Sequence, residues 1–344
     1  MAPLPAPGRL PSIGTMSGTG TSRFRAWWAQ RPPAAGAVVM ATGIVSVGLH
    51  LTGYEVLSRI AFALACAFWL GLAVDFAVRL LRDRRRWLTE AGTPGALTAV
   101  AATAVLGTRF SLGGRQTVAE ALLAPAVVLW PGLLVRVLGN WRGRMPGTVF
   151  LGCVATQSLA VLGATIAGAE SVPWLAHTAL VLFWFGLVLY GFALARFEWR
   201  QVVVGAGDHW IVGGALAVSA LAGSKLIAAD SARLYLWNSD DRGVLRAVTV
   251  ALLVLDAAWC VVLLAAEIAW PRLRYDVRRW STVFPLGMTA ATTLSVGSAV
   301  DVPWLRTPGQ VVLWIAVAAW LVVAAGTVRF YRAGTSGVTS TGPR

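Results

Sequence analysis

Apolar residues fill long segments of this chain, and short polar stretches rich in arginine, glycine and proline separate them. An α-helix needs about 20 apolar residues to cross the hydrocarbon of a bilayer, and ten segments approach or exceed that length. They lie at residues 34–51, 56–81, 95–108, 117–138, 147–168, 172–195, 210–227, 244–270, 282–300 and 307–330. The pattern predicts an all-α integral membrane protein with ten transmembrane helices. The segment 95–108 is the shortest, and its helix could begin earlier, near Trp87.

Basic residues concentrate in alternate connections between the apolar segments. The connections after the second and eighth segments are the richest, with Arg79, Arg82, Arg84, Arg85 and Arg86 in one and Arg272, Arg274, Arg278 and Arg279 in the other. Cytoplasmic connections of membrane proteins carry an excess of Lys and Arg. The distribution therefore predicts that both termini are cytoplasmic. It also supports the segment 95–108, because without it the later arginine-rich connections would lie outside.

The composition agrees with a chain that faces lipid. Hydrophobic residues make up 57% of it and charged residues only 13%, against about 25% charged residues in soluble proteins. The net charge of +14 does not predict nucleic-acid binding, because the arginines lie between apolar segments and form no basic domain. We expect a transmembrane domain at 33–330 in the cell membrane. It is flanked by disordered cytoplasmic tails at 1–32 and 331–344.

The apolar segments alternate in the size of their side chains. The first, third, fifth, seventh and ninth contain many small residues, whereas the others are bulkier, as in 181–185 and 252–255. This alternation predicts a repeat of five helical hairpins, with the small-residue helices inside and the bulky helices outside. Small residues let helices approach closely or leave a narrow lumen between them. The small residues therefore have two interpretations, helix packing alone or the lining of a central pore. The alternation over five hairpins favours the pore.

The predicted pore-lining residues lie on the small-residue helices. In the ninth segment, Phe284, Met288, Ala291 and Ser295 share one stripe of the helix, and the ring of Phe284 is placed to plug a narrow lumen. The alternative is a Phe that packs beside the kink at Pro285. The full predicted lining is Thr42, Gly43, Ser46, Thr103, Thr156, Gln157, Ser219, Pro285, Met288, Ala291, Thr292 and Ser295.

Few ionisable residues lie within the apolar segments, where such groups are costly and often functional. Asp75 and Arg79 have the spacing of a local ion pair on one helix face. Asp256 is a candidate for a proton relay, although a structural role is the alternative. The three cysteines and three histidines are scattered and predict no metal site. We find no pattern for a cofactor or for enzyme catalysis.

Three short motifs identify a family resemblance. Trp280-x-x-x-Phe284-Pro285, the stretch Met40-Ala41-Thr42-Gly43-Ile44 and the stretch Gln157-Ser158-Leu159 resemble the tellurite-resistance/dicarboxylate transporter family, which includes the plant slow-type anion channels. Ala41 stands where the family more often has Gly, and residues 1–32 show no match to the phosphorylation-regulated tail of the plant channels. The resemblance implies five hairpins around a quasi-five-fold pore, often as a homotrimer, with Phe284 as the gate.

These observations predict transport of small anions, such as inorganic anions, oxyanions or C4-dicarboxylates, through a pore gated by Phe284. A proton-coupled exporter of organic anions, sulfite or tellurite that uses Asp75 or Asp256 is the alternative. An integral membrane enzyme has less support. The expected partners are the anion, the lipid bilayer and further copies of the chain.

Overall fold

The computed structural model describes residues 36–205, 207–230, 239–270 and 276–336. Its ten longer helices are α2 (Gly36–Leu51), α3 (Glu55–Arg82), α5 (Thr98–Leu112), α6 (Gln116–Gly139), α7 (Leu151–Glu170), α8 (Pro173–Arg196), α10 (Ile211–Ala229), α11 (Ser239–Ala269), α12 (Trp280–Ala299) and α13 (Arg306–Ser336). Shorter helices are α4 (Arg84–Ala91) and α9 (Gln201–Val204), and the 3₁₀ turns are η2 (Pro94–Leu97), η3 (Gly147–Phe150), η4 (Asp208–Trp210), η5 (Val277–Arg279) and η6 (Pro303–Leu305). The described residues contain no β-strand, and the all-helical prediction is confirmed.

Each predicted apolar segment overlaps one of the ten longer helices. In the described part of the chain, eight helices are long and apolar enough to cross a membrane. Helix α2 is apolar but only 16 residues long, and α12 is not among the eight. The region around Trp87 forms the separate helix α4, and η2 precedes α5. Helix α13 continues to Ser336, past the predicted end at Phe330. The predicted N-terminal tail, 1–32, lies outside the described residues, as do 337–344.

Burial divides the long helices into two groups. About nine-tenths of the apolar windows of α7 and α10 are buried, 94% and 89%, whereas only 11% of those of α3 and α13 are. Small side chains explain the difference, because Gly and Ala allow α7 and α10 to be surrounded closely by other helices. The small-residue helices α2, α5, α7, α10 and α12 are therefore called the inner helices, and α3, α6, α8, α11 and α13 the outer helices.

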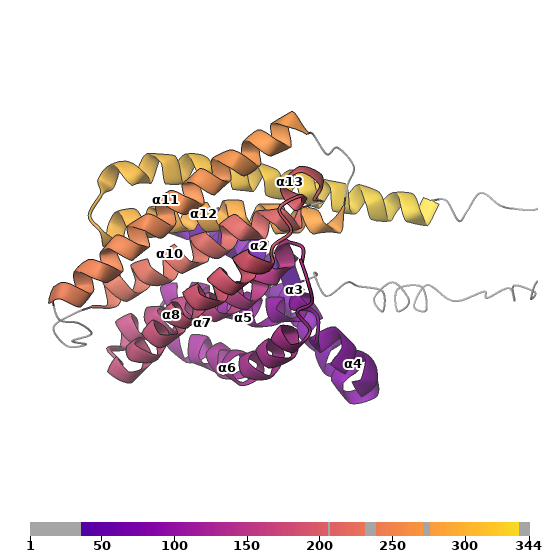
Figure 1. Cartoon of the computed structure of the whole chain (residues 1–344), viewed down its shortest axis with the longest axis horizontal. Helices are drawn as coiled ribbons and strands as arrows, with labels where there is room; N and C mark the ends of the chain where they lie inside the picture. The colour runs from indigo at the N-terminus through magenta and orange to yellow at the C-terminus, as the bar shows by residue number, and fades with distance from the viewer. Residues whose placement is uncertain (1–35, 206, 231–238, 271–275, 337–344) are drawn as a thin grey trace, which may run out of the picture. The chain divides into compact units, whose positions relative to one another are not determined.

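The inner helices contact one another in a closed order. Helix α2 packs on α5, α5 on α7, α7 on α10, α10 on α12, and α12 on α2 again. Each inner helix also packs on the outer helix that follows it in the chain, and each outer helix touches the next inner helix. In Figure 1, α10, α2 and α7 run between α11 and α13 on one side and α6 on the other.

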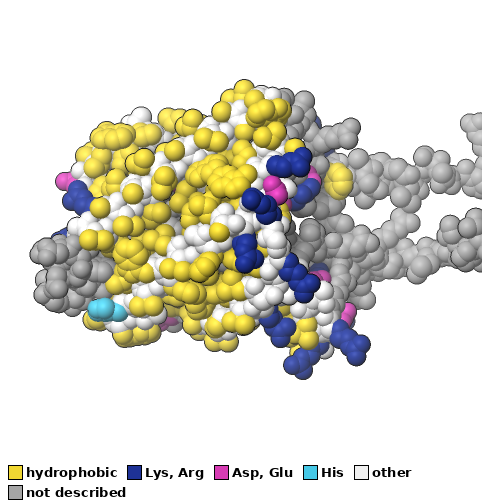
Figure 2. All heavy atoms as spheres, viewed as in Figure 1, with side chains coloured by type: hydrophobic (Ala, Val, Ile, Leu, Met, Phe, Trp, Pro, Cys, Tyr) yellow, Lys and Arg dark blue, Asp and Glu magenta, His cyan; other side chains and the backbone are white. Residues whose placement is uncertain are grey.

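The outer helices present a broad apolar surface. Figure 2 shows hydrophobic side chains over most of the visible face, with Lys and Arg gathered towards one end. The exposed large side chains come from all five outer helices, among them Val74, Val128, Phe192, Ile268 and Val322. A patch of this size is far larger than a soluble monomer exposes, and contact with lipid accounts for it.

Candidate functional site

A cavity of about 90 Å³ lies where the N-terminal ends of the inner helices meet. We call it the Phe284 cavity. Every inner helix, or the 3₁₀ turn that leads into it, contributes to its lining: Ala37 and Met40, Gly95 and Thr98, Thr148 and Leu151, Asp208 and Ile211, and Arg278, Ser281 and Phe284. The N-terminus of a helix carries a partial positive charge and free amide groups. Five such ends around one cavity favour an anion there.

A second, smaller cavity of about 10 Å³ lies further along the same helices. We call it the Lys225 cavity. Its lining is mostly aliphatic and consists of Ile44, Val47, Val105, Thr108, Ser158, Val161, Val218, Leu221, Lys225 and Met288. In its present form it has room for about one water molecule.

The two cavities share one face of each helix. On α2 they are lined by residues 37, 40, 44 and 47, and on α10 by 211, 218, 221 and 225. Spacings of three, four and seven residues keep side chains on one side of an α-helix. The cavities therefore lie one after the other along a common axis between the inner helices.

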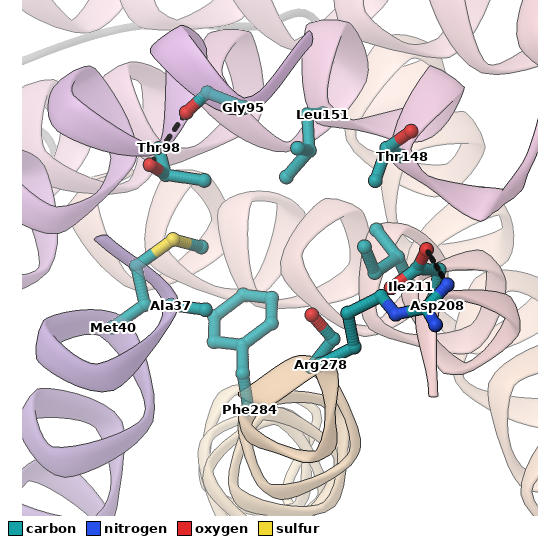
Figure 3. A pocket seen from close by; sticks show the side chains of 11 residues that line it. Ala37, Met40, Gly95, Thr98, Thr148, Leu151, Asp208, Ile211, Arg278 and Phe284 are labelled. Atoms are coloured by element: carbon teal, nitrogen blue, oxygen red, sulfur yellow. Dashed lines mark hydrogen bonds and ion pairs between the residues drawn. The ribbon is translucent and has the colours of Figure 1, made fainter. Parts of the chain in front are cut away.

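Phe284 is the last residue of α12 to line the first cavity before the second begins. It lines the first, and Met288, one turn later on α12, lines the second. Its side chain is only 2% exposed, and Figure 3 shows its ring beside Ala37 and Met40. On α10, a Cβ atom added to Gly214 would come within 3.3 Å of Phe284 Cε1 and 2.9 Å of Pro285 Cγ. The absence of a side chain at Gly214 thus lets the Phe284 ring fit between α10 and α2.

Two charged side chains lie next to each other at one side of the Phe284 cavity. Arg278 Nη1 lies 3.9 Å from Asp208 Oδ2, as drawn in Figure 3. Arg278 also donates a hydrogen bond of 2.9 Å from Nη2 to Oδ2 of Asp276. That hydrogen bond lowers the pKa of the Asp276 carboxyl below its ordinary value and raises the pKa of Arg278. Asp276 therefore stays ionised and holds the guanidinium of Arg278 at the edge of the cavity.

Lys225 is a site residue that the sequence reasoning missed. It is the single lysine of the chain, and it is absent from the predicted pore lining. In the structure it lines the cavity on the far side of Phe284 from the helix N-termini. The sequence offered one signal for this position. Lys225 lies four residues after Leu221 on a small-residue helix, and therefore on the same helix face.

Three of the predicted pore-lining threonines point away from the axis. Each lies two positions before a residue that lines the Lys225 cavity, and two positions turn an α-helix by about 200°. Each hydroxyl instead accepts a hydrogen bond from an indole Nε1 of an outer helix: Trp320 to Thr42 at 3.0 Å, Trp69 to Thr103 at 2.9 Å, and Trp130 to Thr156 at 2.9 Å.

Most of the other predicted lining residues also lie at contacts between or within helices. The reason is that a polar group surrounded by apolar helices is stabilised by a hydrogen bond across the interface. Ser46 donates to the carbonyl oxygen of Ser58, Gln157 to that of Phe183, Thr292 to that of Ala217 and Ser219 to that of Ala215. Gly43 and Pro285 are packed against Val105 and Gly214. Ala291 and Ser295 are buried. Of the predicted lining, Met288 alone lines one of the two cavities described above, together with the predicted gate Phe284.

The predicted charged residues lie away from both cavities. Arg79 Nη2 is 2.8 Å from Asp75 Oδ2, and Nη1 of the same guanidinium is 2.8 Å from Glu90 Oε2 on α4. Asp256 on α11 is 1% exposed. Its Oδ1 accepts a 3.2 Å hydrogen bond from Thr289, and its Oδ2 has no partner among the described residues.

A buried arginine near the C-terminal end of α5 differs from the prediction. Arg109 directly follows the predicted segment 95–108, but α5 continues past it and its exposure is 4%. Its guanidinium donates to Ser58 Oγ at 3.0 Å and to Glu55 Oε1 at 3.1 Å. Glu55 also pairs with His50 at 2.7 Å. Within the described ranges, no group of three His, Cys, Asp or Glu side chains could hold a metal ion.

A family model described as "SLAC1: Voltage-dependent anion channel" matches residues 30–328. The fold and the match together define a helical membrane protein of an anion-channel class. The chain belongs to the SLAC1 voltage-dependent anion channel family, and the family resemblance read from the sequence is confirmed.

Two curated relatives are uncharacterized membrane proteins of Mycobacterium tuberculosis, from strains CDC 1551 / Oshkosh and ATCC 25618 / H37Rv. Each is 28% identical to this chain over 120 residues, which is 33% of this chain and 59% of the relative. The chain thus spans 59% of the length of the curated relatives it matches.

Proposed function

We propose that the chain passes small anions across the cell membrane along the axis of the two cavities, and that Phe284 closes this path. The observation that carries the proposal is that Phe284 lines the first of two cavities, one helical turn before Met288 of the second, and that the same faces of the inner helices line both. In this proposal α2 and α12 also span the membrane, which makes ten spans and five hairpins around a quasi-five-fold pore. The closed order of contacts among the inner helices supports that arrangement.

The charges support anions as the permeating species. Helix N-termini and Arg278 surround one cavity and Lys225 lines the other, and these groups favour an anion. The carboxyl of Asp208 in the first cavity lies beside the guanidinium of Arg278. The excess of arginine at the N-terminal side of the inner helices supports a cytoplasmic location for that side and for both termini. Inorganic anions, oxyanions and C4-dicarboxylates are all in the range of substrates. The family resemblance also suggests a homotrimer, which light scattering of the purified protein in detergent would test.

The experiment is anion conductance of purified protein in a planar bilayer, with wild type compared to Phe284→Ala. We expect the substitution to raise the conductance several-fold, because it removes the ring that we propose closes the path. Phe183→Ala is the matched control, since Phe183 is equally buried but lies on α8 and lines neither cavity. Unchanged conductance in well-folded Phe284→Ala protein would contradict the gate. Absence of anion current in every variant would contradict anion passage itself.

Asp256 favours a second candidate, a proton-coupled exporter of anions such as sulfite, tellurite or dicarboxylates. An unpaired carboxylate buried among apolar helices costs far more than a neutral carboxyl group, so Asp256 could bind and release a proton. Thr289, which donates to it, directly follows Met288 of the Lys225 cavity. Anion flux that requires a proton gradient in wild type and loses that requirement in Asp256→Asn would favour coupling. Flux indifferent to the gradient would favour a passive channel.

A further inference from the structure

Two polar groups that line the Lys225 cavity have no partner in the described part of the chain. The hydroxyl of Ser158 on α7 is 2% exposed and forms no hydrogen bond. Lys225 on α10 is partly buried and forms no ion pair or hydrogen bond there. Asp230, the acid nearest to Lys225 in the chain, pairs with Arg242 instead. Buried polar groups are normally satisfied, and exceptions need an explanation.

A third unpartnered group, on α12, follows Met288 of the Lys225 cavity along the helix. Lys225 is seven residues beyond Val218, and Ser295 on α12 is seven residues beyond Met288; Val218 and Met288 both line the Lys225 cavity. Seven residues are about two helical turns, so Lys225 shares a face of α10 with Val218, and Ser295 shares a face of α12 with Met288. Ser295 is 7% exposed, and its hydroxyl also forms no hydrogen bond among the described residues.

We propose that Lys225, Ser158 and Ser295 form a binding site for a single monovalent anion on the opposite side of Phe284 from the helix N-termini. The inference rests on the proposed function and specifies where an anion pauses on its path. One ammonium group supplies the counter-charge and two hydroxyl groups donate hydrogen bonds, which together satisfy the three groups that otherwise have no partner.

The lining of the Lys225 cavity favours an anion that carries a single charge. Apart from Lys225, Thr108 and Ser158, the cavity presents only apolar side chains. The second carboxylate of a C4-dicarboxylate would meet valine and leucine and would lose its hydration without a cation to replace it. A halide or nitrate carries one charge and needs no second cation. A single lysine also binds weakly enough for release, which conduction requires.

The experiment uses bromide as the probe, because its anomalous scattering identifies it in crystals of the full-length protein grown in sodium bromide. We expect a bromide peak beside Lys225 in wild type, no peak in Lys225→Met, and a retained peak in Lys225→Arg. Ser158→Ala should lower its occupancy. Arg306→Gln is the matched control, since it removes an exposed cation at the start of the outer helix α13 and should leave the peak unchanged.

No peak at Lys225 in wild type, or an equal peak in Lys225→Met, would overturn the site. Nitrate should displace bromide, whereas succinate at the same concentration should not, and displacement by succinate would overturn the monovalent class. The measurement does not depend on flux. A bromide peak together with unchanged conductance in Phe284→Ala would support the binding site and contradict the gate. Raised conductance in Phe284→Ala without a bromide peak would support the gate and contradict the binding site.

Discussion

Phe284 of α12 packs against Gly214 of α10 so closely that a Cβ atom at position 214 would lie 3.3 Å from Phe284 Cε1. The same Cβ would lie 2.9 Å from Pro285 Cγ. Two neighbouring inner helices thus meet at the level where the Phe284 cavity ends. The position of the aromatic ring depends on a glycine that lies seventy positions earlier in the chain.

Gly214→Ala should destabilise the protein by about 1–3 kcal/mol, because an added methyl group in a packed interface forces its neighbours to move. The displaced ring should also change the conductance of the Phe284 path. Thermal unfolding in detergent and bilayer recording would measure the two effects. Gly191→Ala on the lipid-facing side of α8 is the control, since nothing lies within 4 Å of its added Cβ. Equal stability of both variants would contradict the close packing.

The indole–threonine hydrogen bonds predict a stability effect without a permeation effect. Thr42→Val, Thr103→Val and Thr156→Val each leave a tryptophan Nε1 without its acceptor, and each should cost about 0.5–1.5 kcal/mol. Anion selectivity should not change, because none of these threonines lines either cavity. Unfolding temperatures and reversal potentials would test this. Thr178→Val on exposed α8, whose hydroxyl bonds only to its own helix, is the control. Altered selectivity would restore the pore-lining assignment.

The buried guanidinium of Arg109 predicts that Glu55 stabilises the ends of α3 and α5. Glu55→Gln should lower the stability of the protein, because it removes the carboxylate that compensates a cation of 4% exposure. Denaturation of wild type and variant in detergent would measure the difference. Glu120→Gln removes an exposed carboxylate on α6 with no ion pair among the described residues. If Glu55→Gln and Glu120→Gln had the same small effect on stability, the burial of the Arg109 guanidinium would not depend on the carboxylate of Glu55.

The Asp276–Arg278 pair predicts a defined pH dependence. The pKa of Asp276 is lowered in the folded protein by the hydrogen bond from Arg278. The stabilisation is therefore present above the unfolded pKa of about 3.9 and is lost as pH falls through the lower folded pKa. Wild type should exceed Asp276→Asn in stability by about 0.2–1 kcal/mol at neutral pH, and the difference should vanish in acid. A difference that persists in strong acid would contradict the assignment.

The sequence by itself determined the helical class, the apolar segments and the family. Long apolar runs can satisfy their backbone groups in a membrane only as helices or closed barrels, so composition and length decide the secondary structure. The motif around Phe284 identified a residue that lines a cavity, because its resemblance to the family implied a role for that position.

The direction in which each side chain points was decided only by the tertiary structure. Thr42 and Ile44 lie two positions apart on the same helix, yet one accepts a hydrogen bond from Trp320 and the other lines a cavity. Small residues occur on several faces of α2, so its sequence does not reveal which face meets the axis. The neighbouring helices decide which face meets the axis, because their hydrogen-bond donors pair with hydroxyl groups that then point away from the axis. The same contacts bring Lys225 and Ser158, far apart in the sequence, to a single cavity.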